Sequence, residues 1–218
     1  MNEHWERGGR RADLTLVGPR TRAHFKDATG SIRAVTIQFK PGWSMPCLGV
    51  AASELTDTHV SLEDIWGNAA RELCNELLDL TNMADVAQRI ARAIAEHVDE
   101  DLEPTSSRIA RHAVRLLEGS ETRVDVVAHR LGVTPRHLRR AFVENIGVGP
   151  KDFARAVRLQ RVLSLATRSS DWAQIAVEAG YYDQAHLIVD FRDLVGLTPR
   201  EYMRRRTHDR CATADERL

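Results

Sequence analysis

The sequence predicts a mainly α-helical fold in two parts. Residues 105–206 are expected to form a C-terminal domain of seven helices with two helix-turn-helix units, and residues 1–104 a small α+β N-terminal domain. Three observations predict this: apolar residues recur mostly at helical spacing, the second half contains an internal repeat, and the charge divides between the halves. Residues 207–218 are expected to be a disordered tail.

The formal charge of the 218-residue chain is zero, but the charged residues are unevenly distributed. Residues 1–104 contain 11 Lys+Arg and 17 Asp+Glu, whereas residues 105–207 contain 18 and 11. The acidic run that ends at Pro104 is typical of a linker, so we place the domain boundary there. With 43% hydrophobic and 28% charged residues, the composition is globular and excludes a wholly disordered chain.

Composition also limits the location of the chain and its chemistry. No apolar run approaches the ~20 residues of a membrane-spanning helix, and the charged N-terminus does not have the form of a secretory signal. We therefore expect a cytoplasmic protein that does not contact a membrane. Cys47, Cys74 and Cys211 are scattered, which predicts reduced thiols and gives neither a disulfide framework nor a zinc spacing. We expect neither a metal nor a cofactor.

The N-terminal part mixes strand and helix patterns. Apolar residues alternate over residues 31–39, which predicts a strand that ends in the turn at residues 40–42. Further on, helical spacing predicts an antiparallel pair of helices over residues 69–80 and 83–98. Their apolar stripes would pack within their own domain or against a partner subunit, and the sequence leaves both open. Three to four strands are too few for a closed barrel of about eight.

The C-terminal part contains two copies of one pattern, at residues 128–153 and 176–202. The matching positions are Ala128 and Gly132 with Ala176 and Gly180, Leu138 and Phe142 with Leu187 and Phe191, and residues 147–153 with 196–202. The offset between copies changes from 48 to 49 after the glycine, so the second copy has one extra residue in its turn. Such repeats mark one structural unit used twice.

Each copy has the features of a helix-turn-helix. Short helices are predicted at residues 124–131 and 172–179, and second helices at 135–145 and 184–195. The glycine after each short helix supplies the positive φ that a tight turn requires. Further helices are predicted at residues 106–117, at 151–167 between the units, and from 199 to about 206.

Three polar residues are expected to begin helices. Thr134 precedes Pro135 as an N-cap before a first-turn proline, and Asp183 is the corresponding cap in the second copy. Thr198 and Glu201 have the spacing of a capping box for the closing helix. These caps fix where the second helix of each unit begins.

These motifs together resemble the AraC/XylS family of bacterial transcription regulators over residues 105–206. The resemblance rests on Ala128-x3-Gly132, Leu138-x3-Phe142, Ala176-x3-Gly180-Tyr181, Phe191-Arg192 and the closing segment 196–202. It implies a sequence-specific DNA-binding regulator without catalytic activity. Both second helices would be recognition helices in successive major-groove segments, about one DNA turn or ~34 Å apart.

The resemblance leaves several properties of the regulator open. Activation would need a surface that touches RNA polymerase, whereas repression would need only occlusion of the DNA. The chain would act as a monomer or a homodimer. A small-molecule effector in residues 1–104 is a further partner that the family implies.

By family position, the exposed face of the first recognition helix is formed by Arg136, His137, Arg139 and Arg140. Arginine suits either contact, because its fork matches guanine O6/N7 and its charge matches phosphate. The alternative is a basic helix face that is only solvated. Residues 124–168 contain 9 basic and 3 acidic residues, so this unit should supply most of the phosphate-driven affinity.

The second recognition face is expected to be less basic. It would consist of Gln184, His186 and Val189, with Asp183 as a further candidate. Family members usually carry a basic residue at the position of Val189. Residues 171–206 contain 5 basic and 6 acidic residues. Gln184 and His186 would give weak readout of a base edge, and Val189 a contact with a thymine methyl group or none. Arg192 would reach a phosphate or form an ion pair within the domain.

Two other classes of function compete with this interpretation. An Ada-type protein that accepts alkyl groups on cysteine needs clustered zinc-ligating cysteines, whereas Cys47 and Cys74 stand 27 residues apart and Cys74 falls on an apolar helix side. The other class is a protein-partner-binding oligomerisation module centred on the N-terminal part. Residues 49–55 and 62–67 resemble the later half of a sensor region, so we expect a shortened sensor domain. Aromatic side chains there would line a small effector pocket or pack in the core: Phe25, Phe39, Trp43 and Trp66.

Overall fold

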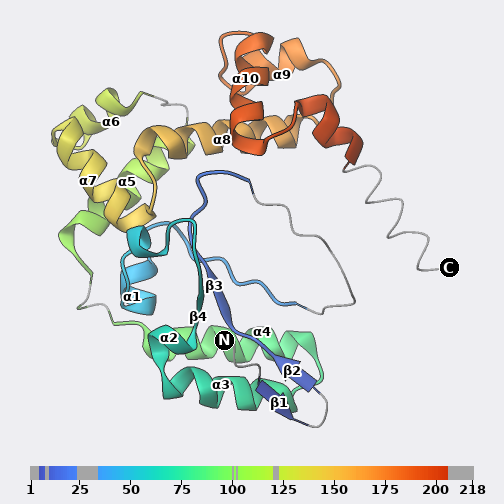
Figure 1. Cartoon of the computed structure of the whole chain (residues 1–218). Coiled ribbons are helices and arrows are strands. Elements are labelled where there is room, and N and C mark those ends of the chain that lie inside the picture. The colour runs from blue at the N-terminus through green and yellow to red at the C-terminus, as the bar shows by residue number, and fades with distance from the viewer. Residues whose placement is uncertain are drawn as a thin grey trace. The chain divides into compact units, whose positions relative to one another are not determined.

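The computed structural model describes residues 5–7, 10–23, 34–99, 101, 103–119 and 123–205 (Figure 1). The described chain forms two compact units, one of residues up to 20 and from 34 to 150, the other of residues 21–23 and 151–205. These units divide after Pro150, and the functional boundary near Pro104 stays a prediction. The expected tail at 207–218 lies outside the described residues. Among the described helices, none has the length and apolarity to span a bilayer.

The start of the first unit is built from short strands. β1 (Trp5–Arg7) pairs antiparallel with β2 (Arg10–Ala12), and β3 (Thr15–Val17) pairs antiparallel with β4 (His59–Ser61). The described part of the chain therefore contains two separate two-stranded sheets. With the helices that follow, these sheets give the α+β character that the sequence predicts.

The strand predicted over residues 31–39 is wrong for its described part. Residues 34–39 alternate between exposed and partly buried side chains as expected, but no strand is assigned to them. Alternation reports which side chains face the core, whereas a strand also requires the ladder hydrogen bonds of a neighbouring strand. Residues 31–33 lie outside the described residues.

Helices complete the core of this part of the chain. In order, they are α1 (Ser44–Leu48), the 3-10 helix η1 (Ala52–Leu55), α2 (Glu63–Trp66), α3 (Asn68–Asp79) and α4 (Met83–His97). The long pair α3 and α4 confirms the two helices predicted from apolar spacing. α4 begins at Asn82, whose side-chain oxygen accepts a hydrogen bond from the Ala84 amide at 2.9 Å.

The apolar stripes of α3 and α4 pack on a shared core. Leu73 and Leu77 of α3 are buried in it, and Ile90 and Ile94 of α4 are partly buried against it. The apolar stripes therefore pack within their own domain, which is one of the two possibilities that the sequence leaves open. Phe39, Trp43 and Trp66 also pack partly buried against this core, whereas Phe25 lies outside the described residues. Their arrangement accords with core packing.

A buried polar network joins α5 (Thr105–Glu118) to α7 (Pro135–Ile146), beside the short α6 (Val124–Arg130). Ser107 is fully buried and donates to Asn145 Oδ1 at 2.5 Å. The Asn145 amide donates in turn to Ser106 Oγ at 3.1 Å and to the Ala141 carbonyl at 2.7 Å. Because each buried group finds a partner, the network fixes the position of α7 on α5 without an unpaired polar atom.

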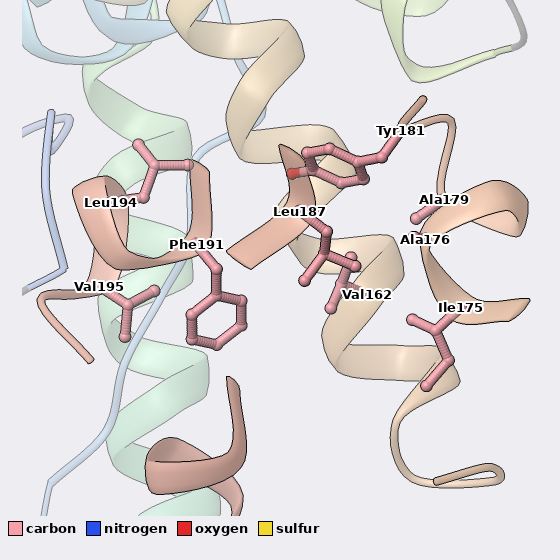
Figure 2. Close-up of a cluster of buried hydrophobic side chains, with 9 residues drawn as sticks. All are labelled: Val162, Ile175, Ala176, Ala179, Tyr181, Leu187, Phe191, Leu194 and Val195. Carbon is pink, nitrogen blue, oxygen red and sulfur yellow. The ribbon is translucent and has the colours of Figure 1, made fainter. Parts of the chain in front are cut away.

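The second compact unit contains α8 (Pro150–Leu165), α9 (Trp172–Glu178) and α10 (Gln184–Val195). Helical residues 199–205 follow them. Figure 2 shows its core, in which Val162 of α8, Ile175 of α9 and Leu187 and Phe191 of α10 are buried side chains. The closing helix begins with the predicted capping box, because Glu201 accepts from the Thr198 amide at 2.8 Å. Residues 105–205 thus contain the seven helices that the sequence predicts, within the described chain.

The glycine that ends α7 contacts the N-terminal part of the chain. Gly147 has φ +85°, and its carbonyl oxygen accepts a hydrogen bond from Thr56 Oγ1 at 2.7 Å. A Cβ placed at Gly147 would lie 2.7 Å from Pro19 Cγ and 2.8 Å from the Ala52 carbonyl oxygen. The end of α7 is therefore closely packed as well as left-handed.

Alanine at Gly147 should destabilise the protein more than alanine at its repeat partner. Gly196 ends α10 with φ +76°, and a Cβ there would meet no atom within 4 Å. Gly196→Ala is expected to lower the free energy of unfolding by about 1–2 kcal/mol through left-handed strain alone. Gly147→Ala adds overpacking of about 1–3 kcal/mol. Urea unfolding of both variants measures the difference, and equal losses would contradict the close packing at Gly147.

Candidate nucleic-acid interface

The first helix-turn-helix closes with one backbone hydrogen bond and one cap. Ala128 is fully buried in α6, and its carbonyl accepts from the Val133 amide at 3.0 Å across the turn. Gly132 occupies that turn with φ +65°, as predicted. Thr134 then caps α7, because its hydroxyl accepts from the His137 amide at 3.2 Å. The start of α7 is therefore set by the sequence on both sides of the turn.

The second helix-turn-helix repeats the same bonds at the matching positions. The Tyr181 amide donates to the Ala176 carbonyl at 2.9 Å, and Gly180 has φ +86°. Asp183 caps α10, because its carboxylate accepts from the His186 amide at 2.7 Å. The repeat seen in the sequence is therefore a repeat of hydrogen-bonded structure, and both predicted N-caps are confirmed.

The side of α7 that is turned to solvent carries three arginines. Leu138 and Phe142 are fully buried, as their inward positions predict. Arg136, Arg139 and Arg140 are exposed and lie at i, i+3 and i+4 spacing, which places them on one face of the helix. This face is what a groove-reading helix requires: long cations on one side and apolar anchors on the other.

A hollow of about 910 Å³ adjoins this arginine face, open to solvent. His137 is partly buried and lines the hollow together with the three arginines of α7. The hollow is also lined by Ser106 of α5 and Ser53 of η1. The N-terminal part of the chain thus reaches the border of α7, which the sequence did not indicate.

The matching face of α10 is exposed but carries less charge. Gln184, His186 and Val189 are all exposed, with 69% of Val189 accessible. The His186 ring lies edge-on to the Tyr181 ring, with centroids 5.3 Å apart. Arg192 is also exposed, near the end of the helix. The predicted residues of each unit thus lie together on one helix, α7 or α10.

One exposed residue next to α10 was missed from the sequence. Tyr182 is 90% exposed and lies between the turn and the Asp183 cap. It is the extra residue that changes the repeat offset from 48 to 49. That change in offset was the available signal, since an inserted residue at the start of a recognition helix has no counterpart in the first unit.

The acidic residues of α10 bind arginines of α8. Asp190 is buried and accepts hydrogen bonds from Arg155 Nε at 2.6 Å and from Tyr181 Oη at 2.9 Å. Arg155 also donates to the exposed Asp193 at 2.6 Å, which lowers the pKa of that carboxyl. Arg158 lies 3.9 Å from Asp190. Burial beside the Asp190 carboxylate raises the pKa of Tyr181.

These ion pairs change how the charge of the second unit is interpreted. Asp190 and Asp193 are two of the six acidic residues that offset the five basic ones in residues 171–206. In the structure both are paired with Arg155, so they do not present uncompensated negative charge. Arg155 and Arg158 of α8 thus lie beside Asp190, with which both form ion pairs. Asp190 holds α10 against α8.

The cysteines of the N-terminal part are buried in the core. Burial raises the pKa of the Cys47 thiol and, with contributions from Asp13 and Glu63, raises that of Cys74 to about 11. A thiol with a raised pKa is a poor nucleophile at neutral pH, because the thiolate is the reactive form. In the part of the chain that is described, no group of three His, Cys, Asp or Glu side chains is placed to hold a metal ion.

We expect iodoacetamide at pH 7.5 to modify neither Cys47 nor Cys74 in the folded protein over a time that fully modifies both in urea. Peptide mass spectrometry measures each site separately, and the difference between folded and unfolded samples is the control. Rapid modification of Cys74 in the folded chain would contradict its burial and would favour the alkyl-acceptor alternative.

Comparisons with known proteins agree with this geometry. Residues 127–205 match the family model of a helix-turn-helix domain. The HTH-type transcriptional regulator GlxA of Rhizobium meliloti (strain 1021) is 34% identical over 97 residues, which cover 41% of this chain and 30% of that protein. The chain thus spans less than a third of the length of this relative.

Two solved structures are also similar. An AraC-type transcriptional regulator from Chromobacterium violaceum is 29% identical, with 44% of this chain and 89% of that chain covered and a TM-score of 0.41. A DNA-binding transcriptional dual regulator from Escherichia coli K-12 is 23% identical, with 50% and 99% covered and a TM-score of 0.39.

The capped, repeated units and the family match define residues 127–205 as a helix-turn-helix domain. The two paired units and the closing segment at residues 196–202 are the features on which the resemblance to the AraC/XylS family rests. The C-terminal part of the chain thus contains a helix-turn-helix domain with the features that the resemblance to the AraC/XylS family predicts.

Proposed function

We propose that the chain is a sequence-specific DNA-binding transcription regulator whose helices α7 and α10 enter successive major-groove segments of one duplex. The observation that carries the proposal is the repeated unit itself. In both copies a capped helix follows the same hydrogen-bonded turn and exposes one face of polar or basic side chains. An α-helix presented in this way fits the major groove of B-form DNA.

The first unit is proposed to supply most of the affinity and the stronger base readout. Arg136, Arg139 and Arg140 are exposed on one face of α7, whereas Arg111 of the neighbouring α5 is already paired with Glu103. A bidentate arginine contact with guanine is worth about 1–3 kcal/mol of discrimination against the wrong base. Arginines that instead meet phosphates add affinity for every sequence through the release of counterions.

The second unit is proposed to add a weaker, mostly uncharged readout. The Gln184 amide matches the donor and acceptor of adenine, and the exposed Val189 side chain matches a thymine methyl group. His186 offers one further hydrogen bond at a base edge. Because Arg155 holds Asp190 from α8, the angle of α10 on α8 is fixed before DNA arrives, which reduces the entropy lost on binding.

The remaining parts of the proposal follow from the family resemblance. They are a cytoplasmic location, a functional boundary near Pro104, a small-molecule effector site in residues 1–104, and a surface for RNA polymerase if the chain activates transcription. A homodimer would place two such domains on one operator, whereas a monomer would use the two helix-turn-helix units alone. Sedimentation with and without operator DNA decides between these two states.

A selection experiment tests the proposed function with the full chain. Duplexes with a random segment are bound in the presence of excess bulk DNA, and the enriched sequences are read after several rounds. We expect one enriched motif with two parts about one helical turn, or ~10 base pairs, apart. If no sequence competes better than bulk DNA, the regulator function is wrong and a protein-binding role gains support.

A further inference from the structure

A short N-terminal segment packs on the second recognition helix. Residues 21–23 belong to the second compact unit, although they precede the whole C-terminal domain in sequence. The Ala23 amide donates a hydrogen bond to the Leu194 carbonyl in the last turn of α10 at 2.8 Å. The final carbonyls of a helix have no partner within the helix, so this bond satisfies one of them. It also fixes the backbone beside Arg22.

The side chain next to this bond is a cation. Arg22 is exposed and lines an open hollow of about 280 Å³ with Arg192 and Asp193. Asp193 already accepts a hydrogen bond from Arg155 at 2.6 Å. The residues that line the hollow therefore include two arginines and one aspartate, and that aspartate is engaged in an ion pair with Arg155. Such a site attracts an anion.

Before Arg192, the helix α10 of the second helix-turn-helix carries no Lys or Arg. Gln184, His186 and Val189 are exposed on α10 and carry no Lys or Arg charge, and residues 171–206 contain 5 basic and 6 acidic residues. A helix that inserts into the major groove is normally held by cations that bind the flanking phosphates. Arg192 is one such cation on α10, and Arg22 brings a second one to the same place from outside the helix-turn-helix domain.

We propose that Arg22, held in place by the Ala23–Leu194 hydrogen bond, acts with Arg192 to bind a backbone phosphate of the duplex at the C-terminal end of α10. The inference rests on the proposed function and extends it to a residue of the N-terminal part. It makes residues 21–23 an arm that contributes to DNA binding. Arms of this kind add contacts that the recognition helix cannot reach by itself.

The test measures the salt dependence of binding by the full chain. Each phosphate contact contributes about 0.9 to the slope of log K against log salt for B-form DNA. Arg22→Ala is expected to reduce the slope by about one and to weaken binding of selected and unselected duplexes by the same factor. Arg22→Lys keeps the charge and should retain most of the slope. Ala23→Pro removes the amide donor and should reduce the slope as Arg22→Ala does.

Arg20 provides the matched control two residues away. Its guanidinium donates to the Asp57 carbonyl at 3.1 Å and contacts the His59 ring in the first unit, so Arg20→Ala should leave the slope unchanged. An unchanged slope for Arg22→Ala would overturn the inference, as would equal changes for Arg20→Ala and Arg22→Ala. A wild-type chain that binds all duplexes equally would instead refute the proposed function, since the slope is also read on unselected DNA.

Discussion

Replacing Arg139 with alanine is expected to weaken binding of the full chain to its selected duplex by about 1–3 kcal/mol, roughly 5- to 150-fold. Arg139 is exposed on the same face of α7 as Arg136 and Arg140, and its fork can meet a guanine or a phosphate. Gln184→Ala on α10 removes a neutral side chain from the less basic unit and should cost less than about 1 kcal/mol. Fluorescence anisotropy at one fixed salt concentration compares the two variants.

A lysine variant separates the two possible roles of Arg139. If its fork reads a guanine, Arg139→Lys will lose discrimination between the selected duplex and a duplex changed at one base pair. If Arg139 binds phosphate, Arg139→Lys will bind nearly as well as the wild type, and Arg139→Ala will lower the salt slope by about one. Equal losses for Arg139→Ala and Gln184→Ala would contradict the unequal roles of α7 and α10.

Replacing Asp190 with alanine is expected to lower the free energy of unfolding by about 3 kcal/mol, because loss of one partner leaves the other charge of a buried ion pair uncompensated. The Asp190 side chain is 8% exposed and binds both Arg155 and Tyr181. Asp193→Ala removes the other carboxylate that pairs with Arg155, but the Asp193 side chain is 52% exposed. A pair this accessible contributes little to stability, because water and salt screen it, and urea unfolding of the two variants measures the contrast.

The same variants link stability to DNA binding. Tyr181→Phe removes only the hydrogen bond to Asp190 and should destabilise by about 1 kcal/mol. If Asp190 fixes α10 on α8, Asp190→Ala will weaken binding even at temperatures where the variant is fully folded, and Asp193→Ala will not. Equal unfolding free energies for Asp190→Ala and Asp193→Ala would show that the buried pair does not hold the second unit together.

Local signals predicted the helices of the C-terminal part closely. The second helix of each unit was bounded by a cap at its start and a glycine at its end, and the structure places α10 at the predicted Gln184–Val195 and α7 one residue longer than predicted. Caps and left-handed glycines act through atoms within a few residues, so a single sequence contains the information. The residues of the candidate site could be proposed from the sequence for the same reason, because each was assigned by its position on one of these helices.

Contacts between distant segments could not be predicted in the same way. The hydrogen bond of Ala23 to Leu194 joins residues 171 positions apart, and nothing in the local pattern of either segment indicates it. The burial of Asp190 could not be predicted from α10 alone, because its partners, Arg155 and Tyr181, come from other parts of the chain. The strand predicted at residues 34–39 was wrong for a similar reason. Alternating burial suggested a strand, but no neighbouring strand pairs with these residues. In each case the deciding partner was remote in sequence.

Hydroxyl-radical footprinting of the full chain on its selected duplex tests the central claim most directly. Helices α7 and α10 in successive major-groove segments should give two protected stretches on one face of the DNA, about one helical turn apart. Alanine at Arg136, Arg139 and Arg140 together should abolish the stretch bound by α7. A single uniform footprint, or no protection above that of bulk DNA, would contradict the claim that this chain reads DNA with two recognition helices.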